Sequence, residues 1–176
     1  MPKIRFSKKA KDIYIQFTAI IAISIVMTNI FFKPIQVSGT SMYPTLKDGE
    51  VGISYILPVK LRKIKRFDIV VVYSDKLNEY LIKRVVGLPG ETVEYRNSKL
   101  FINGSLVDED FLSDTYTSKY EVFTDNTEVI KLGKDEYYCV GDNRPNSSDS
   151  RILGPFKFKQ IVSTGFLDFM KIKKIK

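Results

Sequence analysis

The chain has 176 residues, a formal net charge of +8, one cysteine and no histidine. This length suits one domain of ordinary size, and a composition of 44% apolar and 27% charged residues is typical of a folded chain. The missing histidine excludes a Ser-His-Asp triad, a Cys-His pair and a histidine-ligated metal centre. The base of a hydrolase would then be a carboxylate, a tyrosine or a lysine. We expect no metal and no cofactor, and we expect Cys139 to be a buried packing residue because no histidine can activate its thiol.

An uncharged apolar segment at residues 13–32 is long enough to cross a bilayer as a helix. Basic residues precede it, with Asp12 as the only acid. The positive-inside rule therefore places residues 1–12 in the cytoplasm and the chain after Lys33 on the outer face of the membrane. The preceding basic residues are Lys3, Arg5, Lys8, Lys9 and Lys11.

Two other interpretations of this segment fit less well. A cleaved signal peptide has an apolar stretch of about 7–15 residues and then a small-x-small site, whereas this run is longer and leads into Phe31-Phe32-Lys33-Pro34. A buried core helix would carry a polar stripe, but the polar residues between positions 16 and 29 are uncharged and scattered. The sequence therefore predicts an uncleaved membrane anchor.

The basic charge by itself suits either an anionic membrane surface or a nucleic acid. It is concentrated before the apolar segment, in residues 60–66 and in the tail 171–176, without a recognisable nucleic-acid-binding motif. This distribution favours membrane lipid as a partner and no nucleic acid. For the tail, contact with anionic lipid and simple solvation are equal alternatives.

The rest of the sequence predicts a mainly β domain at residues 34–170. Runs rich in β-branched and apolar residues at 68–73, 80–86 and 137–140 are typical of strands. Lys47-Asp48-Gly49 and Leu88-Pro89-Gly90 are typical of turns, and residues 99–107 predict a hairpin around Asn103-Gly104. A polar, acidic segment at 108–128, within an insert at about 92–136, predicts a surface excursion from this domain.

Three segments contain residues with catalytic potential: 37–46 with Ser41, 80–91 with Lys83, and 141–151 with Ser147. Each segment also has an ordinary structural explanation. Ser41 lies in a Gly/Ser/Thr-rich turn, where hydroxyls mostly bond backbone, and Lys83 follows an apolar strand, where a lysine can extend to solvent. The third segment could be a polar loop stabilised by an Asp149–Arg151 pair.

Taken together, these segments resemble the bacterial type I signal peptidases. Four boxes occur in family order: Ser-Gly-Thr-Ser-Met-Tyr-Pro-Thr at 38–45, Lys-Arg-Phe-Asp-Ile-Val-Val at 65–71, Lys-Arg-Val-Val-Gly-Leu-Pro-Gly-Glu at 83–91 and Gly-Asp-Asn-Arg-Pro-Asn-Ser-Ser-Asp-Ser-Arg at 141–151. With the anchor, the resemblance covers residues 1 to about 161, and ordered boxes of this length are a specific signal. It implies an N-terminal transmembrane helix followed by a LexA/signal-peptidase-like antiparallel β catalytic domain with a small insert.

The resemblance implies a Ser–Lys dyad in which Ser41 is the nucleophile and Lys83 is the general base. Ser147 corresponds to the serine that orients the lysine amine, and Asp149 and Arg151 correspond to an ion pair that supports the loop. A lysine acts as a base only when neutral. Burial lowers its pKa from about 10.4, and a value of roughly 7–8 would suit general base catalysis.

The oxyanion of an acyl-transfer reaction needs hydrogen-bond donors, and the backbone N–H of Ser41 is the expected first donor. Some members of the family add a hydroxyl two residues before the nucleophile, where this chain has Gly39. Ser38, Thr40 and water are therefore open alternatives for the second donor.

The resemblance also implies the substrate: signal peptides of exported preproteins, cleaved after small residues at the first and third positions before the scissile bond. Those two side chains share a face of an extended substrate, so shallow apolar pockets would select Ala-sized groups, and the substrate backbone would pair with an edge strand. The expected pocket residues are Val37, Gly39, Met42, Val71, Leu81 and Ile82.

Two alternatives accompany general signal-peptide removal. One is a peptidase dedicated to a single export or pilus-assembly system. The other is a catalytically silent homologue that serves as an assembly factor or chaperone. Silent homologues lack the nucleophile or the lysine, whereas this chain has Ser41, Lys83 and Ser147.

Overall fold

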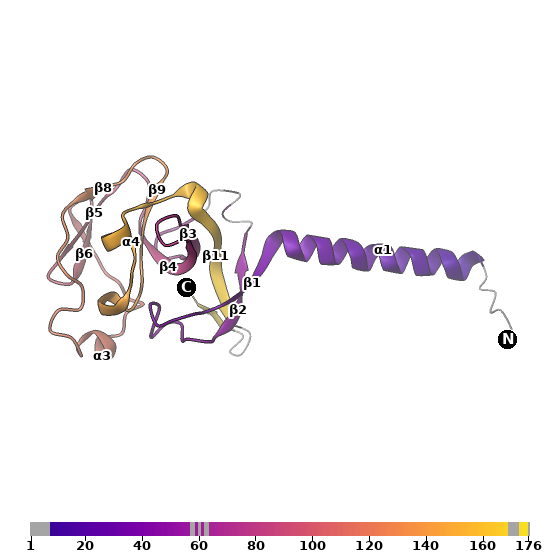
Figure 1. The fold of residues 1–176 in the computed structure, drawn as a ribbon, viewed down its shortest axis with the longest axis horizontal. Helices are drawn as coiled ribbons and strands as arrows, with labels where there is room; N and C mark the ends of the chain where they lie inside the picture. Colours follow the sequence, from indigo (N-terminus) through magenta and orange to yellow (C-terminus); the bar gives the residue numbers. More distant parts are fainter. Residues whose placement is uncertain (1–7, 57–58, 60, 62–63, 169–172, 176) are drawn as a thin grey trace. The chain divides into compact units, whose positions relative to one another are not determined.

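The chain forms two units, Met1–Phe32 and Lys33–Lys176. The computed structural model describes residues 8–56, 59, 61, 64–168 and 173–175. In the described part of the chain, the first unit consists of a long helix and the second of strands with short helical turns (Figure 1). The elements are α1 (Lys8–Phe31), β1 (Phe32–Gln36), β2 (Val51–Tyr55), β3 (Ile69–Ser74), β4 (Glu79–Gly87), β5 (Thr92–Arg96), β6 (Lys99–Ile102), β7 (Ser105–Val107), α3 (Asp114–Thr117), β8 (Ile130–Lys131), β9 (Glu136–Val140), η1 (Arg144–Asn146), α4 (Ser150–Leu153), β10 (Phe156–Lys157), η2 (Phe158–Gln160), β11 (Ile161–Asp168) and β12 (Lys173–Ile175).

Helix α1 contains residues 13–31 of the predicted apolar segment and begins earlier, at Lys8, whereas Phe32, the last residue of the predicted segment, begins β1. By length and composition, its residues Lys8–Thr28 could cross a membrane. Large apolar side chains such as Ile13 are more than half exposed along it. The hydroxyls of Thr18 and Thr28 donate to carbonyl oxygens one turn earlier in the helix, so neither needs a water partner. The helix is therefore compatible with a membrane anchor.

The strands of the second unit form two antiparallel sheets, which confirms the mainly β prediction. The larger sheet has the order β1-β2-β11-β3-β4-β9-β10, with β12 beside β11, and the smaller has the order β7-β6-β5-β8. Figure 1 shows β5, β6 and β8 grouped apart from β3, β4 and β11. The smaller sheet is built from the part of the sequence in which the insert was expected.

Strand β3 forms from the β-branched run predicted at 68–73 and contributes to two apolar clusters. Val70 and Val72 pack in a cluster with Cys139, whereas Ile69 packs in another with Met42. Successive side chains on a strand point to opposite faces, so one strand can serve both clusters. Each of these buried aliphatic side chains contributes about 1.5–3 kcal/mol relative to exposure. Cys139 is fully buried, as expected.

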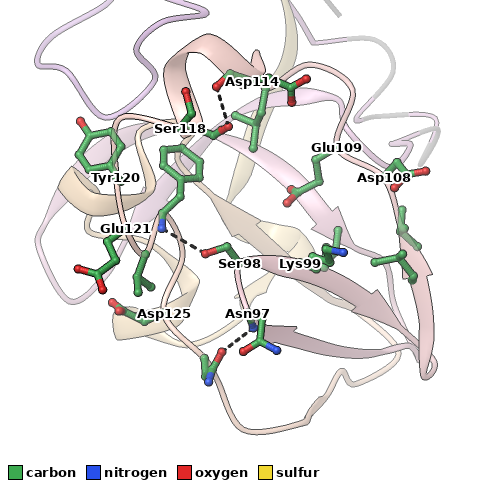
Figure 2. Close-up of a pocket in the computed structure, with 18 residues that line it drawn as sticks. Asn97, Ser98, Lys99, Asp108, Glu109, Asp114, Ser118, Tyr120, Glu121 and Asp125 are labelled. Carbon is green, nitrogen blue, oxygen red and sulfur yellow. Dashed lines mark hydrogen bonds between the residues drawn. The ribbon is translucent and has the colours of Figure 1, made fainter.

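The polar segment at 108–128 is less superficial than its composition suggests. Helix α3 lies within it, and the Ser113 hydroxyl caps this helix by accepting from the Tyr116 N–H. Tyr116 and Phe123 are buried, with ring centroids 5.7 Å apart in an edge-on arrangement. A cavity of about 820 Å³ is bounded by this segment and by residues of β6 and β7. Figure 2 labels Glu109 and Glu121 among the residues that line it. Tyr116 also meets the Tyr43 ring edge-on at a centroid distance of 5.4 Å, so aromatic packing attaches part of the insert to the rest of the domain.

The predicted basic tail at 171–176 falls largely outside the described residues. Of the tail, the structure describes β12, which pairs with the end of β11. The prediction of lipid binding by this tail is therefore not addressed by the structure.

Candidate active site

Ser41 lies in a loop between β1 and β2 that backbone geometry and packing hold in place. The N–H of Gly39 donates to Asp48 Oδ1 over 2.7 Å, and the φ of Gly39 is +86°, a conformation that favours glycine. Val37 before Ser41 and Met42 after it are 3% and 1% exposed and belong to one apolar cluster. These contacts fix the chain on both sides of the Ser41 hydroxyl.

Lys83 lies in β4 and is only 2% exposed. Its Nζ donates to Ser41 Oγ over 2.8 Å, and its partner across the sheet is Val70 of β3. Burial lowers the pKa of Lys83 to about 8, while the Asp149 carboxylate opposes this shift and the Arg151 guanidinium adds to it. At pH 8 about half of such lysines are neutral and able to accept a proton.

Asp149 and Arg151 form the predicted ion pair beside the dyad. The Asp149 carboxylate accepts from Arg151 Nε at 2.9 Å and Nη2 at 2.8 Å, and also from the backbone N–H of Gly141 at 2.9 Å. Burial by itself would raise the pKa of Asp149. The Arg151 guanidinium and the Gly141 N–H together lower it by more, so the pKa of Asp149 lies below its ordinary value. Arg151 also donates to the Arg144 carbonyl over 2.7 Å. The pair therefore closes the 141–151 segment into a fixed loop.

Ser147 lies near Ser41, but its hydroxyl does not bond the lysine amine in the structure. Its Oγ is buried and makes no well-formed hydrogen bond among the described residues, but it is close enough to the Asp149 carboxylate to lower the pKa of that group. A Cβ placed on Gly141 would come within 2.2 Å of Ser147 Oγ and 2.5 Å of the Ser41 carbonyl oxygen. Ser147 and Ser41 are therefore packed against the same glycine.

Asn143 connects the loop of Ser147 to the loop of Ser41, a role that the sequence analysis did not anticipate. Its backbone N–H donates to the Ser41 carbonyl over 3.0 Å, and its Nδ2 donates to the Thr40 carbonyl over 3.1 Å. Asn146 adds a bond from its Nδ2 to Thr40 Oγ1, also at 3.1 Å. The position of Asn143 in the Gly-Asp-Asn-Arg box was a signal that could have identified it.

Arg84 and Asp142 form a second ion pair that the sequence analysis missed, and both side chains are completely buried. Arg84 donates to the two carboxylate oxygens of Asp142 from Nε at 2.8 Å and Nη2 at 2.7 Å. Thr45 Oγ1 donates to the same carboxylate over 2.6 Å, and Arg84 Nη1 donates to the Phe67 carbonyl. This pair joins β4, the loop after β9 and the loop of Ser41. Arg84 follows Lys83 in one family box and Asp142 follows Gly141 in another, and this position in the boxes could have identified the pair.

A cavity of about 330 Å³ opens beside Ser41. Of the six predicted pocket residues, the lining contains all except Gly39, whose N–H is bonded to Asp48 instead. Ser38 lines the cavity and Thr40 does not, so the lining favours Ser38 over Thr40 as a second oxyanion donor. The lining residues are Lys33, Ile35, Gln36, Val37, Ser38, Ser41, Met42, Val71, Glu79, Tyr80, Leu81, Ile82, Val162 and Ser163.

No group of three or more potential metal ligands occurs among the residues that the structure describes. The Ser41 hydroxyl and the Lys83 amine of lowered pKa lie at the edge of a cavity with both polar and apolar lining residues.

Comparisons with known proteins agree with this arrangement. The family model for signal peptidase, peptidase S26, matches residues 10–170. Signal peptidase I of Bacillus amyloliquefaciens is 38% identical over 168 residues, which cover 89% of this chain and 87% of that protein. Signal peptidase I S of Bacillus subtilis (strain 168) is 38% identical over 162 residues, which cover 88% and 87%.

A crystal structure of a signal peptidase I from Enterococcus faecalis V583 is also similar. It is 36% identical, with a TM-score of 0.53, and the match covers 57% of this chain and 95% of that one. The family match includes the loop of Ser41, the strand of Lys83 and the loop of Asp149. The chain therefore belongs to the signal peptidase family, peptidase S26.

Proposed function

We propose that this chain is a membrane-anchored serine endopeptidase that removes signal peptides from exported preproteins with a Ser41–Lys83 dyad. One observation carries the proposal: the Nζ of a lysine that is 2% exposed lies 2.8 Å from a serine Oγ, and that serine lines a cavity. An exposed lysine would stay charged at neutral pH and could not act as a base. The lowered pKa of Lys83, about 8, supplies a neutral amine under mild conditions.

In the proposed reaction, neutral Lys83 Nζ takes the Ser41 hydroxyl proton as Oγ bonds to the substrate carbonyl carbon. The carbonyl electron pair moves to oxygen, and the Ser41 N–H stabilises this oxyanion. The Lys83 ammonium then gives its proton to the leaving amine as the C–N bond breaks, which leaves an ester on Ser41. Water attacks this ester, Lys83 takes the proton of the water, and the carboxyl product leaves as the proton returns to Ser41 Oγ.

We assign Ser147 the role of orienting the Lys83 amine. Its buried hydroxyl supports this assignment, because it makes no well-formed hydrogen bond that would keep it from the amine. Catalytic hydrogen bonds are often loose without substrate and shorten in the complex. The Asp149–Arg151 pair holds the Ser147 loop and does not take part in proton transfer.

The free edge of β4 supports binding of an extended substrate. Strand β3 pairs with Glu79–Arg84 on one side, whereas β9 pairs with β4 only from Arg84 onward. Among the strands that the structure describes, residues 79–83 therefore have no sheet partner on their second side. A substrate strand along this edge would direct alternate side chains into the cavity lined by Val71 and Ile82. The cavity, of about 330 Å³, has room for two Ala-sized side chains, at the first and third positions.

We further propose that α1 is an uncleaved anchor with residues 1–12 in the cytoplasm and the catalytic unit outside. The basic residues before the apolar run support this orientation. Ser41 follows Phe31, the last residue of α1, by ten positions (41 − 31), which limits its distance from the helix end to about 35 Å. A signal peptide leaving the bilayer is within that reach.

The test uses the full-length protein in detergent with a preprotein and an Ala-x-Ala peptide. Ser41→Ala removes the nucleophile and Lys83→Ala removes the base, so both are expected to lose turnover to background. Lys83→Arg is expected to lose it too, because a guanidinium keeps its proton at neutral pH. The exposed positions Ser105 and Lys134 give matched controls, Ser105→Ala and Lys134→Ala, which are expected to keep wild-type turnover. Turnover by Ser41→Ala would overturn the proposal.

A pH profile tests the base directly. The dyad is active when Lys83 is neutral, so kcat/KM is expected to rise with pH through the Lys83 pKa of about 8. A profile that is flat between pH 7 and 9 would contradict the assignment of Lys83 as the base.

A further inference from the structure

Tyr116 of the insert lies at the start of a chain of hydrogen bonds that ends at the Thr40–Ser41 peptide. Its hydroxyl donates to Asn143 Oδ1 over 2.9 Å, a contact that is buried. Because the amide oxygen of Asn143 faces the tyrosine, its Nδ2 faces the Thr40 carbonyl, to which it donates over 3.1 Å. The Tyr116 hydroxyl therefore selects which end of the Asn143 amide meets the Ser41 loop.

The Thr40 carbonyl and the Ser41 N–H belong to one planar peptide unit and point in opposite directions. The Thr40 carbonyl accepts from Asn143 Nδ2 and also from the backbone N–H of Tyr43, over 3.0 Å, and these two donors together set the direction of the Ser41 N–H. The following peptide is held as well, because the Asn143 N–H donates to the Ser41 carbonyl over 3.0 Å. A donated bond at the carbonyl also polarises the peptide and strengthens its N–H as a donor.

The surroundings of Tyr116 keep its ring in one place. It is 7% exposed and contacts the Tyr43 ring edge-on at a centroid distance of 5.4 Å and the Phe123 ring at 5.7 Å. An ion pair also connects the 108–128 segment to the 141–151 loop. The Glu109 carboxylate pairs with buried Arg144, which follows Asn143 in sequence. Figure 2 shows that Glu109 lies on the segment that bounds the insert cavity.

We propose that Tyr116 is a positioning residue of the insert that acts through Asn143 to aim the Ser41 N–H at the oxyanion. This inference rests on the proposed role of Ser41 and extends it to a residue outside the family boxes. It gives the insert a part in catalysis, because α3 brings the Tyr116 hydroxyl to the loop that contacts Ser41.

The test compares Tyr116→Phe with wild type at saturating and subsaturating peptide, using the full-length protein in detergent. The variant keeps the ring contacts and loses one hydroxyl, so kcat is expected to fall roughly tenfold with KM within about twofold. The loss is smaller than the 10²–10³ that removal of a whole oxyanion donor costs. Tyr73→Phe is the matched control, since its hydroxyl also donates to an asparagine Oδ1, that of Asn78 in an exposed turn. The control is expected to keep the wild-type kcat.

A double-mutant cycle separates positioning from a general loss of stability. In an Asn143→Ala background the Tyr116→Phe change is expected to have no further effect on kcat, because the intermediate residue is gone. Additive losses, or an unchanged kcat in Tyr116→Phe, would overturn the inference. Activity in Ser41→Ala would instead overturn the proposed function, so the two failures are distinguishable.

Discussion

At position 83 a lysine amine has lost almost all contact with water, and this affects the stability of the fold as well as its chemistry. The pKa of Lys83 falls from 10.5 in the unfolded chain to about 8 in the folded one because of burial. Between these values the unfolded state binds more protons, so stability rises with pH across this window. Below pH 8 the full destabilisation is present, about 3 kcal/mol for a shift of this size at 1.36 kcal/mol per unit.

Replacement of the amine by an apolar group of similar length is therefore expected to stabilise the protein while removing its activity. Lys83→Met should raise the free energy of unfolding at pH 7 by about 1–3 kcal/mol, with the gain shrinking toward zero near pH 10.5. Urea unfolding of both proteins at pH 7 and pH 10 measures the difference. Lys134→Met, at an exposed position, is the control and should change neither value. An equal loss of stability at both pH values would show that the amine is not destabilising.

The residue types of the site could be predicted from the sequence, but their contacts could not. The absence of histidine and the family boxes led to Ser41 and Lys83. The bonds of Asn143 to the Ser41 loop depend on how two loops meet in space, which no local pattern encodes. The buried Arg84–Asp142 pair was missed for the same reason.

At the scale of elements, the 141–151 loop packs against the Ser41 loop at a point where only glycine fits. A Cβ on Gly141 would lie 2.5 Å from the Ser41 carbonyl oxygen, which is backbone and cannot rotate away. Gly141→Ala is therefore expected to push the two loops apart and to reduce kcat/KM at least 100-fold, since a shift of about 1 Å has this effect at an active site. Steady-state cleavage of the peptide measures it.

Gly133→Ala is the matched control for Gly141→Ala. A Cβ there would meet only the flexible Glu136 side chain, at 3.1 Å, so activity should stay within about twofold of wild type. Near-normal kcat/KM in Gly141→Ala would show that the loop contact does not set the position of Ser41.

Strand β11 shows which elements the sequence pattern could not predict. The runs that became β3, β4 and β9 are continuous and apolar, whereas β11 contains Ser163-Thr164-Gly165 in its centre. Its pairing shifts register against β3 after Ile161 and against β2 after Thr164. These shifts interrupt the alternation of inward and outward side chains, so the sequence of β11 shows no regular alternation of apolar and polar residues. Because β11 was not predicted, Ser163 in the wall of the substrate cavity was not predicted either.

At the scale of the whole chain, the proposed topology rests on the basic residues that precede the apolar helix. The structure describes α1 and the β unit separately, and the charge distribution provides the argument for direction. An enzyme for exported preproteins must place its dyad on the outer face, where the signal peptide emerges. The opposite orientation would separate the dyad from its substrate.

Cysteine labelling tests this orientation without altering the site. Cys139 is completely buried, so the wild-type protein is expected to resist a membrane-impermeant maleimide in intact cells and after permeabilisation. Ser105→Cys, in the exposed hairpin of the insert, should react in intact cells, whereas Lys9→Cys at the N-terminal end of α1 should react only after permeabilisation. Both variants keep the basic bias before the apolar run, since several lysines and Arg5 remain. Labelling of Lys9→Cys but not Ser105→Cys in intact cells would place the catalytic unit in the cytoplasm and contradict the proposed topology.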